Sequence, residues 1–479
     1  MSTENHSSST AVKTNENAVQ FNTQSETDSL LLDDLGQHPY LYKIYTQICC
    51  IFPVHDDSRG SQDKIVNTLR CGLDKLARHF PWIAGDVKYD EADNLYKIRA
   101  TGEIPFIVND LRQDPSAPTM TCLRDASFPC QFLDESTVAP YHTINSPEIT
   151  YSAKVSAPVF AIQANFIVGG LILTFVTQHN VTDMTGQDNI MALLSKACHG
   201  LPFTPQELAI GRMDRTKVIR PLDDSYDIWN PGPELDNHIQ KLHSSFPTGQ
   251  ATNATWACVG FSQESLHRLK SQATATKNSS TPFISTDDAI CAFIWKCISR
   301  ARLSRLDSKI TSTMSRVVNI RERMGIPSSY LGMLCSLTFQ KMTLQDLASK
   351  SVGENASYLR SLLDPTVVDL VYQARAFSTF IARSGDQKNL ASFTANMDTS
   401  HDLMTSSWSN IRCYNYDFNL GLGTPEAVLR PIFPAFEGLI YLMPRSTSGG
   451  LTVQICLGDE DWGNLKEDVE FNLFATYIG

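Results

Sequence analysis

Apolar and polar positions along the chain form alternating blocks that predict strands. The stretch YKIYTQICCIF, residues 42–52, is rich in β-branched and aromatic side chains and ends at a proline, which is typical of a strand. VFAIQANFIVGGLILTFVTQ, residues 159–178, holds two apolar runs separated by Gly169 and Gly170. This pattern predicts two buried strands joined as a hairpin.

Other blocks repeat at helical spacing. One run, ended near Pro81, carries apolar residues three or four positions apart at Ile65, Leu69, Leu73 and Leu76. DMTGQDNIMALLSKACHG, residues 183–200, predicts a second helix that begins at Thr182 or Asp183 and ends at Gly200.

The second half of the chain repeats this mixture. FSQESLHRLKSQA (261–273) and STDDAICAFIWKCISRARL (285–303) predict helices, the latter with a capping box between Ser285 and Asp288. MSRVVNIRERM (314–324), GLIYLMP (438–444) and LTVQICLG (451–458) predict strands.

These elements predict an α/β (α+β) fold of two halves. Residues 1–30 are rich in Ser, Thr, Asn and Glu, and we expect a disordered tail there. Residues 31–214 form the first predicted domain and residues 253–479 the second. The turn-rich, polar residues 215–252 predict a crossover linker between them.

Charge and composition narrow the classes of partner. The 479 residues carry a net charge of −11, which argues against nucleic acid and acidic membrane surfaces. The longest apolar stretch, FIVGGLILTFV, is much shorter than the roughly 20 residues that span a bilayer. We therefore expect a soluble, cytoplasmic protein.

A histidine marks the end of the second predicted hairpin strand. His179 is followed four residues later by Asp183, in the stretch QHNVTD. A neutral imidazole held rigidly at a strand end can take a proton from an alcohol. A structural histidine is the alternative. A metal site would need further ligands, and a serine hydrolase would favour a GxSxG turn; neither is present nearby.

Two further acidic residues call for interpretation. Asp183 could orient His179, but at the start of a helix its carboxylate is better placed to cap the helix or pair with an arginine, for which Arg321 is the candidate. Asp417 precedes a glycine-rich turn in YDFNLGLG, where Gly421 lets the backbone bend sharply. By itself this second stretch could be any surface loop.

Together these motifs resemble the BAHD acyltransferases, which use acyl-CoA. The family's His-x-x-x-Asp is matched at residues 179–183, and its Asp-Phe-Gly-Trp-Gly at 417–421, with departures at Asn419 and Leu420. A Ser-Ser-Trp segment lies just upstream at 406–408. Within this group, LGQHPYLYKIYTQI, GGLILTFVTQH and YDFNLGLGTPE resemble the fungal trichothecene 3-O-acetyltransferases, which act in mycotoxin biosynthesis.

The resemblance implies two chloramphenicol-acetyltransferase-like domains with mixed sheets and an active-site tunnel between them. It implies that His179 is the general base, with acetyl-CoA as co-substrate, no bound cofactor, no metal and no acyl-enzyme. Ser406 becomes the oxyanion candidate, whereas Leu420 cannot replace the family's tryptophan as a donor. Asp417 and Gly421 would shape their loop, and Asn419 suits a positive φ if the position requires one.

Several alternatives stay open. The acceptor could be a trichothecene C-3 hydroxyl, an alkaloid or a polyketide alcohol. A condensation domain of a peptide synthetase shares the fold but carries two adjacent histidines, whereas Gln178 precedes His179 here. A silent relative that only binds a small molecule would be consistent with the changes at Asn419 and Leu420. Because the family's tunnel lies within one chain, a monomer is expected.

Overall fold

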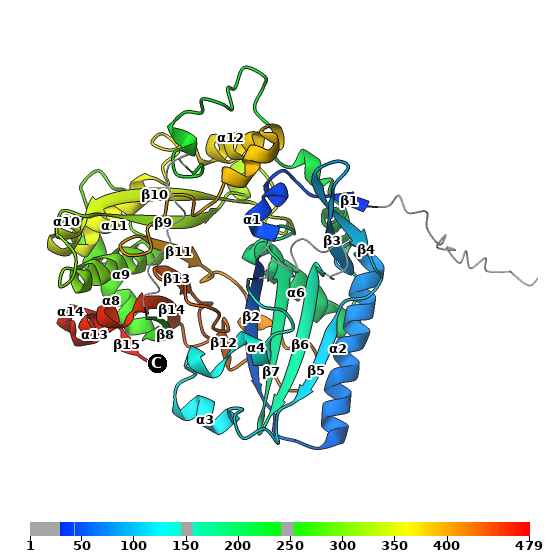
Figure 1. The fold of residues 1–479 in the computed structure, drawn as a ribbon. Coiled ribbons are helices and arrows are strands. Elements are labelled where there is room, and N and C mark those ends of the chain that lie inside the picture. The colour runs from blue at the N-terminus through cyan, green and yellow to red at the C-terminus, as the bar shows by residue number, and fades with distance from the viewer. Residues whose placement is uncertain (1–28, 43, 145–156, 241–252) are drawn as a thin grey trace, which may run out of the picture.

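The computed structural model describes residues 29–42, 44–144, 157–240 and 253–479. Two large mixed β-sheets stand side by side, each with its own helices, and Figure 1 shows them as two lobes. The predicted α/β architecture with mixed sheets is confirmed.

The first lobe is built on a five-stranded sheet. Its strands, in spatial order, are β12 (Ala427–Leu429), β2 (Tyr45–Pro53), β7 (Gly170–Gln178), β6 (Phe160–Ile167) and β5 (Phe106–Asp110). Only β5 and β6 pair in parallel. The inner strands β2, β6 and β7 are almost wholly buried, which explains their continuous apolar sequences. A small antiparallel sheet lies beside this lobe, in the order β1 (Ser29–Leu31), β4 (Leu95–Ala100) and β3 (Gly85–Asp90).

The second lobe is built on a seven-stranded sheet. Its order is β10 (Cys335–Thr343), β9 (Thr311–Asn319), β11 (Leu403–Ser407), β13 (Leu439–Leu442), β14 (Leu451–Gly458), β8 (Ala254–Phe261) and β15 (Thr476–Tyr477). Strand β11 is parallel to both of its neighbours, and the other pairs are antiparallel.

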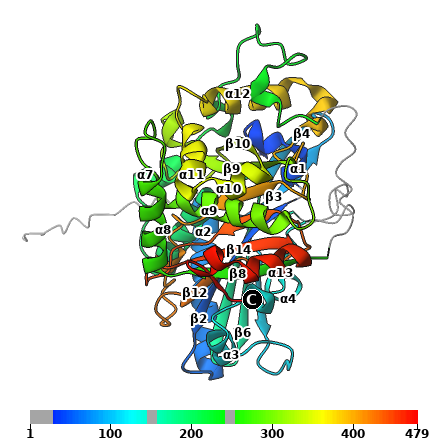
Figure 2. The same ribbon diagram turned by 90° about the vertical axis from the view of Figure 1, so that its left-hand side faces the viewer.

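Helices cover the sheets. They are α1 (Pro39–Tyr42), α2 (Arg59–His79), α3 (Met120–Asp125), α4 (Glu135–Val138), α6 (Met184–Cys198), α7 (Pro205–Gly211), α8 (Gln263–Ala275), α9 (Thr286–Arg302), α10 (Leu344–Ser349), α11 (Val352–Ser361), α12 (Leu370–Arg383), α13 (Asp459–Glu467) and α14 (Val469–Asn472). Figure 2 shows α8 to α11 stacked over the second lobe, while α2 and α6 pack together on the first. Each lobe therefore encloses an apolar core of its own.

Most of the predicted elements are confirmed. β6 and β7 form the expected hairpin, with Gly169 at φ +73° in its turn. α9 begins with the predicted capping box of Ser285 and Asp288. One strand was predicted too long: β9 ends at Asn319, and Glu322–Met324 form a 3₁₀ turn, because Arg321 leaves the sheet to bind across to the first lobe.

One strand from the C-terminal part of the sequence belongs to the sheet of the first lobe. β12 belongs to the C-terminal part of the sequence but pairs with β2 of the first lobe. The predicted tail, residues 1–30, lies outside the described residues except for Ser29 and Leu30. Of the predicted linker 215–252, residues 241–252 also lie outside them. The domain boundaries at 214 and 252 stay a prediction.

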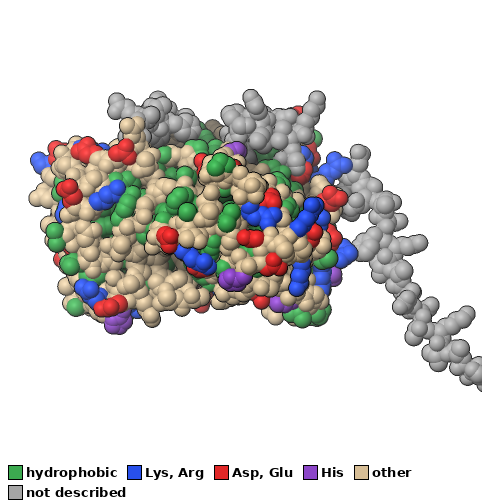
Figure 3. All heavy atoms as spheres, turned by 90° about the horizontal axis from the view of Figure 1, so that it is seen from below, with side chains coloured by type: hydrophobic (Ala, Val, Ile, Leu, Met, Phe, Trp, Pro, Cys, Tyr) green, Lys and Arg blue, Asp and Glu red, His purple; other side chains and the backbone are tan. Residues whose placement is uncertain are grey.

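The surface is mixed in charge. Figure 3 shows acidic and basic side chains interspersed on the face that it presents, without a large basic patch. Across the described ranges, no helix is long and apolar enough to cross a membrane.

Candidate active site

His179 sits where β7 hands over to α6. Its backbone N–H donates to the carbonyl of Ile44 at 2.9 Å, which ties the strand end to the start of β2. Its ring Nδ1 lies 3.3 Å from the carbonyl oxygen of Thr182. Because a carbonyl oxygen can only accept, this contact places the proton on Nδ1 and leaves a lone pair on Nε2.

The surroundings of His179 keep its imidazole neutral. Burial lowers the pKa of His179 below its ordinary value of 6.5. Asp183 opposes this shift, and the positive charge of Arg430 adds to it. The ring therefore has the protonation state that a general base needs at neutral pH.

Asp183 is committed to holding the loop. Its Oδ1 accepts from the backbone N–H of Gly186 at 2.9 Å and from Nη2 of Arg321 at 2.8 Å. Its Oδ2 accepts from Nη1 of Arg321 at 2.8 Å and from the N–H of Leu334 at 2.9 Å. Burial alone would raise the pKa of Asp183, but Arg321 and these N–H groups bring it below its usual value.

The partner of Asp183 is anchored as firmly. Arg321 is 1% exposed. Its guanidinium also donates to the carbonyl oxygens of Tyr330 at 3.2 Å and Gly332 at 2.6 Å. Asp183 and Arg321 are 138 residues apart in sequence, so this bidentate pair joins the first lobe to the second.

The first turn of α6 packs closely against the loop that carries His179 and against the second lobe. A Cβ added at Gly186 would lie 2.0 Å from Oγ1 of Thr182 and 2.4 Å from the carbonyl oxygen of Leu331. Only glycine allows α6 to start this close to both. Sequence spacing gave no sign of this requirement.

A cavity of about 410 Å³ opens in front of His179, between the two lobes. Its walls combine segments from both halves of the sequence: His38, Tyr40, Leu41, Ile44, Tyr45, Thr46, Thr143, Ile144, His179, Asp183, Met184, Thr185, Val317, Asn319, Met333, Cys335, Leu337, Ser392, Phe393, Thr394, Met404, Ser406, Ser407, Trp408, Arg430, Phe433, Phe436, Leu439 and Tyr441. Most are apolar, so water inside would be poorly held and charges on the wall would act strongly.

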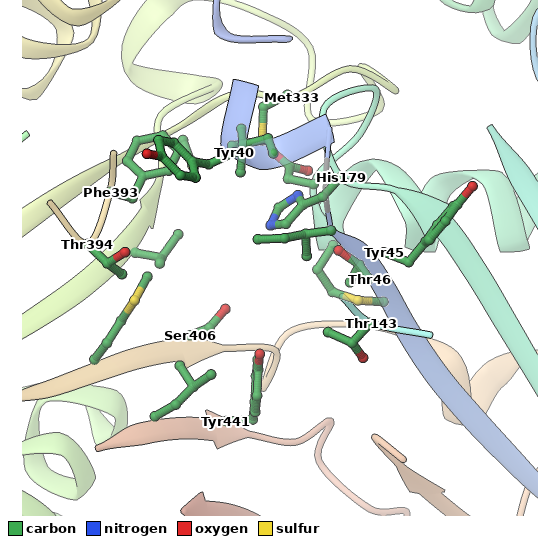
Figure 4. A pocket seen from close by; sticks show the side chains of 18 of the residues that line it. Tyr40, Tyr45, Thr46, Thr143, His179, Met333, Phe393, Thr394, Ser406 and Tyr441 are labelled. Carbon is green, nitrogen blue, oxygen red and sulfur yellow. The ribbon is translucent and has the colours of Figure 1, made fainter. Parts of the chain in front are cut away.

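Ser406 faces this cavity from β11. Nε1 of Trp408 donates to the Ser406 hydroxyl oxygen at 3.0 Å, so the hydroxyl proton is free to point elsewhere. Figure 4 shows the Ser406 oxygen and the His179 ring directed into the same space from different walls. Between them they offer a proton acceptor and a hydrogen-bond donor to a molecule bound there.

The structure places Asp417 and Gly421 elsewhere. Asp417 does not line the cavity; its Oδ1 accepts from Nε2 of His199 at 2.6 Å, just beyond the far end of α6. Gly421 has φ +76° and Asn419 has φ +55°, so the turn does require left-handed backbone at both positions. Leu420 is buried in the first lobe's core and presents no donor to the cavity.

Sequence reasoning missed some polar residues of the cavity wall. Arg430 follows β12 and is 2% exposed, and His38 precedes α1 and is 1% exposed. Arg430 belongs to no recognisable motif, and the stretch LGQHPYLYKIYTQI gives no sign of what His38 does, because both residues reach the cavity only through the packing of distant segments. Among the described residues, no cluster of three or more His, Cys, Asp or Glu side chains could hold a metal ion.

Comparison with known proteins fits this geometry. Residues 44–198 match the family model of the trichothecene 3-O-acetyltransferase-like N-terminal domain. A trichothecene 3-O-acetyltransferase of Saccharomyces cerevisiae is 47% identical, over 94% of this chain and 95% of its own length. The chain belongs to the trichothecene 3-O-acetyltransferase family. A second member, TRI101 of Fusarium sporotrichioides, is 42% identical over 96% of this chain and 100% of its own length.

Solved structures extend the comparison. Fusarium graminearum TRI101 complexed with coenzyme A and deoxynivalenol superposes with a TM-score of 0.89 at 39% identity, covering 94% of this chain and all of that one. Vinorine synthase, at 18% identity and a TM-score of 0.64, shares the fold. The resemblance to the BAHD-type fold is confirmed, and three relatives at 41–47% identity are named O-acetyltransferases.

Proposed function

We propose that the protein moves an acetyl group from acetyl-CoA to a hydroxyl group of a fungal secondary metabolite. A trichothecene C-3 hydroxyl is the first acceptor to test, since two relatives above 40% identity are named for that reaction. Bound coenzyme A in the related Fusarium structures supports the thioester as donor. The observation that carries the proposal is the neutral His179 ring and the Ser406 hydroxyl facing one largely apolar cavity.

In the proposed mechanism the alcohol lies beside Nε2 of His179. The ring takes the hydroxyl proton as the alcohol oxygen attacks the thioester carbonyl carbon. The carbonyl oxygen becomes negative, and the Ser406 O–H donates a hydrogen bond to it. When the tetrahedral intermediate collapses, the C–S bond breaks and His179 returns its proton to the thiolate. No acyl-enzyme forms.

The remaining motif residues would position this pair. Asp183 and Arg321 fix the loop that carries His179, and Asp417 with Gly421 shapes a turn at the other end of α6. The apolar walls would hold both substrates together and exclude water, which favours transfer over hydrolysis. We propose that residues 31–214 and 253–479 supply the two walls within one monomer.

Two other functions make different predictions. If the acceptor is an alkaloid or polyketide alcohol, the same residues would act on it; a 41% identical relative from Cryptosporiopsis is named simply an O-acetyltransferase, with no trichothecene in its name. A silent relative would bind acceptors without releasing thiol. An intact His179 with an available Nε2 favours turnover.

The test is thiol release from acetyl-CoA in the presence of trichothecene, alkaloid and polyketide alcohols. His179→Ala should lower kcat/KM by roughly 10²–10⁴-fold, the range of a lost general base. Ser406→Ala should lower kcat by about 10²–10³-fold, as for a lost oxyanion donor. Turnover that survives His179→Ala would overturn the mechanism. Acceptor binding without thiol release would support the silent relative.

A further inference from the structure

Arg430 is a buried cation in the wall of the cavity. It follows β12 directly and is 2% exposed. The side-chain amide of Gln454 holds its backbone at both ends: the Arg430 N–H donates to Oε1 at 2.8 Å, and Nε2 donates to the Arg430 carbonyl oxygen at 2.8 Å. The side chain therefore starts from a fixed point.

Two aromatic rings and two oxygens fix its guanidinium. The guanidinium carbon lies 3.9 Å from the ring centre of Phe433 and 5.1 Å from that of Tyr441, and both rings line the cavity. Nη2 donates to the Thr143 hydroxyl at 2.8 Å, and Nη1 donates to the carbonyl oxygen of Pro431 at 3.0 Å. The side chain of Tyr441 also forms a hydrogen bond with the guanidinium. A guanidinium carries five N–H donors, so these three bonds leave others for a bound molecule.

The ion pairing of Arg430 differs from that of most buried arginines. Within the described residues, Arg302, Arg316 and Arg321 each have a carboxylate within 3.5 Å. Arg430 has none within ion-pair distance. Arg215 also lacks one, but it does not line the cavity and packs on Trp82 instead. Arg430 is thus a buried cation that faces substrate space without a carboxylate in contact.

The positive charge of Arg430 is balanced by Glu135, which it reaches through the Thr143 hydroxyl. The Thr143 hydroxyl accepts from Arg430 and donates to Oε2 of Glu135 at 2.6 Å. Glu135 also accepts from the Thr143 backbone N–H at 2.7 Å and from Nε2 of Gln47 at 3.1 Å. The relay Arg430–Thr143–Glu135 therefore presents directed N–H donors with little net charge. Such a site suits a neutral acceptor oxygen better than a carboxylate, which would face Glu135 as well.

Thr143, the middle residue of this relay, lies in the part of the cavity wall next to the start of β2. Tyr45 N–H donates to the carbonyl oxygen of Thr143 at 2.8 Å, so Thr143 belongs to the wall made by the start of β2. Figure 4 shows Thr143, His179 and Ser406 on the walls of one pocket. An alcohol whose reacting hydroxyl lies beside His179 can meet the Thr143 wall with another of its atoms, because both residues line the same cavity.

We infer that Arg430 selects the acceptor by donating hydrogen bonds to a neutral oxygen of the alcohol, such as a ring ether, epoxide or ketone, away from the hydroxyl that reacts. This inference rests on the proposed acetyl transfer. It makes Arg430 a specificity residue, and Thr143 and Glu135 the groups that orient it.

The experiment compares two alcohols of one skeleton, with and without a ketone or ring oxygen distant from the reacting hydroxyl. In the wild type, kcat/KM should be roughly 10–100 times higher for the oxygen-bearing alcohol, as for a hydrogen bond to a charged group. Arg430→Met, which keeps the volume between the rings, should bring the ratio close to 1. An analogue with a carboxylate at that position should be a poorer wild-type substrate than the ketone.

Arg375→Met is the matched control. Among the described residues, Arg375 donates to the carbonyl oxygens of Arg220 and Pro221, and it does not line the cavity. It should leave the ratio at the wild-type value. If Arg430→Met does not fold, Thr143→Val, which removes the orienting hydroxyl, should still lower the ratio.

Three outcomes would overturn the inference. A ratio unchanged in both Arg430→Met and Thr143→Val would exclude selection by Arg430. An equal loss for both alcohols would place the cation at the thioester instead. A wild type that turns over neither these alcohols nor any other would overturn the proposed function, and the inference with it.

Discussion

The two sequence motifs hold opposite ends of one helix, α6. At its start, Asp183 caps the helix inside the interface between the lobes, and His179 stands just before it in the cavity wall. At its end, Asp417 bonds His199 and the side chain of Asn419 donates to the carbonyl oxygen of Cys198. Fifteen residues of helix separate these ends by about 22 Å.

The two loops differ in exposure and in what they can do. The Asp183 carboxylate is buried and has four donors, whereas the side chains of Asp417 and His199 are 42% and 37% exposed. The first loop meets substrate space. The second instead inserts Phe418, fully buried, against Phe175 at 5.2 Å between ring centres. A motif with an aspartate thus lines the cavity in one case and anchors the chain in the other.

Removing the charge of each aspartate tests this difference between the two loops most directly. Asp183→Asn keeps a helix-capping side chain but leaves the Arg321 guanidinium buried without its counter-charge. We expect the free energy of unfolding to fall by about 3–5 kcal/mol, and thiol release to fall because the His179 loop loses its anchor. Denaturant titration and the thiol assay measure both effects.

Asp417→Asn is the contrast. Because its ion pair with His199 is partly exposed, we expect a loss of ~1 kcal/mol or less and near-normal turnover. If Asp417→Asn were as damaging as Asp183→Asn, the assignment of the second loop to anchoring would be wrong.

We also expect kcat/KM to depend on pH through the protonation of His179. Burial lowers the pKa of His179 below 6.5, and only the neutral ring is a base, so activity should persist above that pKa and fall as the pH drops through it. The midpoint of kcat/KM against pH should therefore lie below 6.5. A midpoint clearly above 6.5 would contradict a His179 whose pKa is lowered by its surroundings.

Stability must be measured over the same range, because other histidines are buried. Burial lowers the pKa of His38 to about 3 and that of His238 to about 4. Between pH 6.5 and about 4 the unfolded chain binds protons that the folded protein does not. Stability is therefore full above pH 6.5 and falls on acidification, by up to ~1.4 kcal/mol per unit for each histidine.

A further prediction concerns the left-handed turn of the second loop. Asn419→Ala should cost about 1–2 kcal/mol, because alanine disfavours φ +55° and loses the bond to Cys198. Asn419→Gly keeps the backbone accessible and should cost about 1 kcal/mol or less. Thermal unfolding distinguishes the two, with turnover as the control. Equal costs for both substitutions would mean that the side chain, and not the backbone angle, matters there.

Individual strands, turns and helix starts could be predicted because the residue spacing, turn residues and helix caps in these segments agree with the fold. The β6–β7 hairpin, the start of α6 at Asp183 and the capping box of α9 all follow from spacing, turn residues and caps. Arg321 could be named as a partner for Asp183 only by charge and motif, and the strand that carries it was predicted too long. Its departure from β9 depends on an ion pair with the other lobe.

The sequence by itself determined the apolar strands, the capped helices and the position of His179 at a strand end, because these depend on neighbours within a few residues. The tertiary structure alone decided which distant groups surround that histidine. β12 crosses to the first sheet, and this brings Arg430 to the Thr143–Glu135 pair, 287 residues from Thr143 in sequence. Such contacts come from packing two cores against each other, and no local spacing records them.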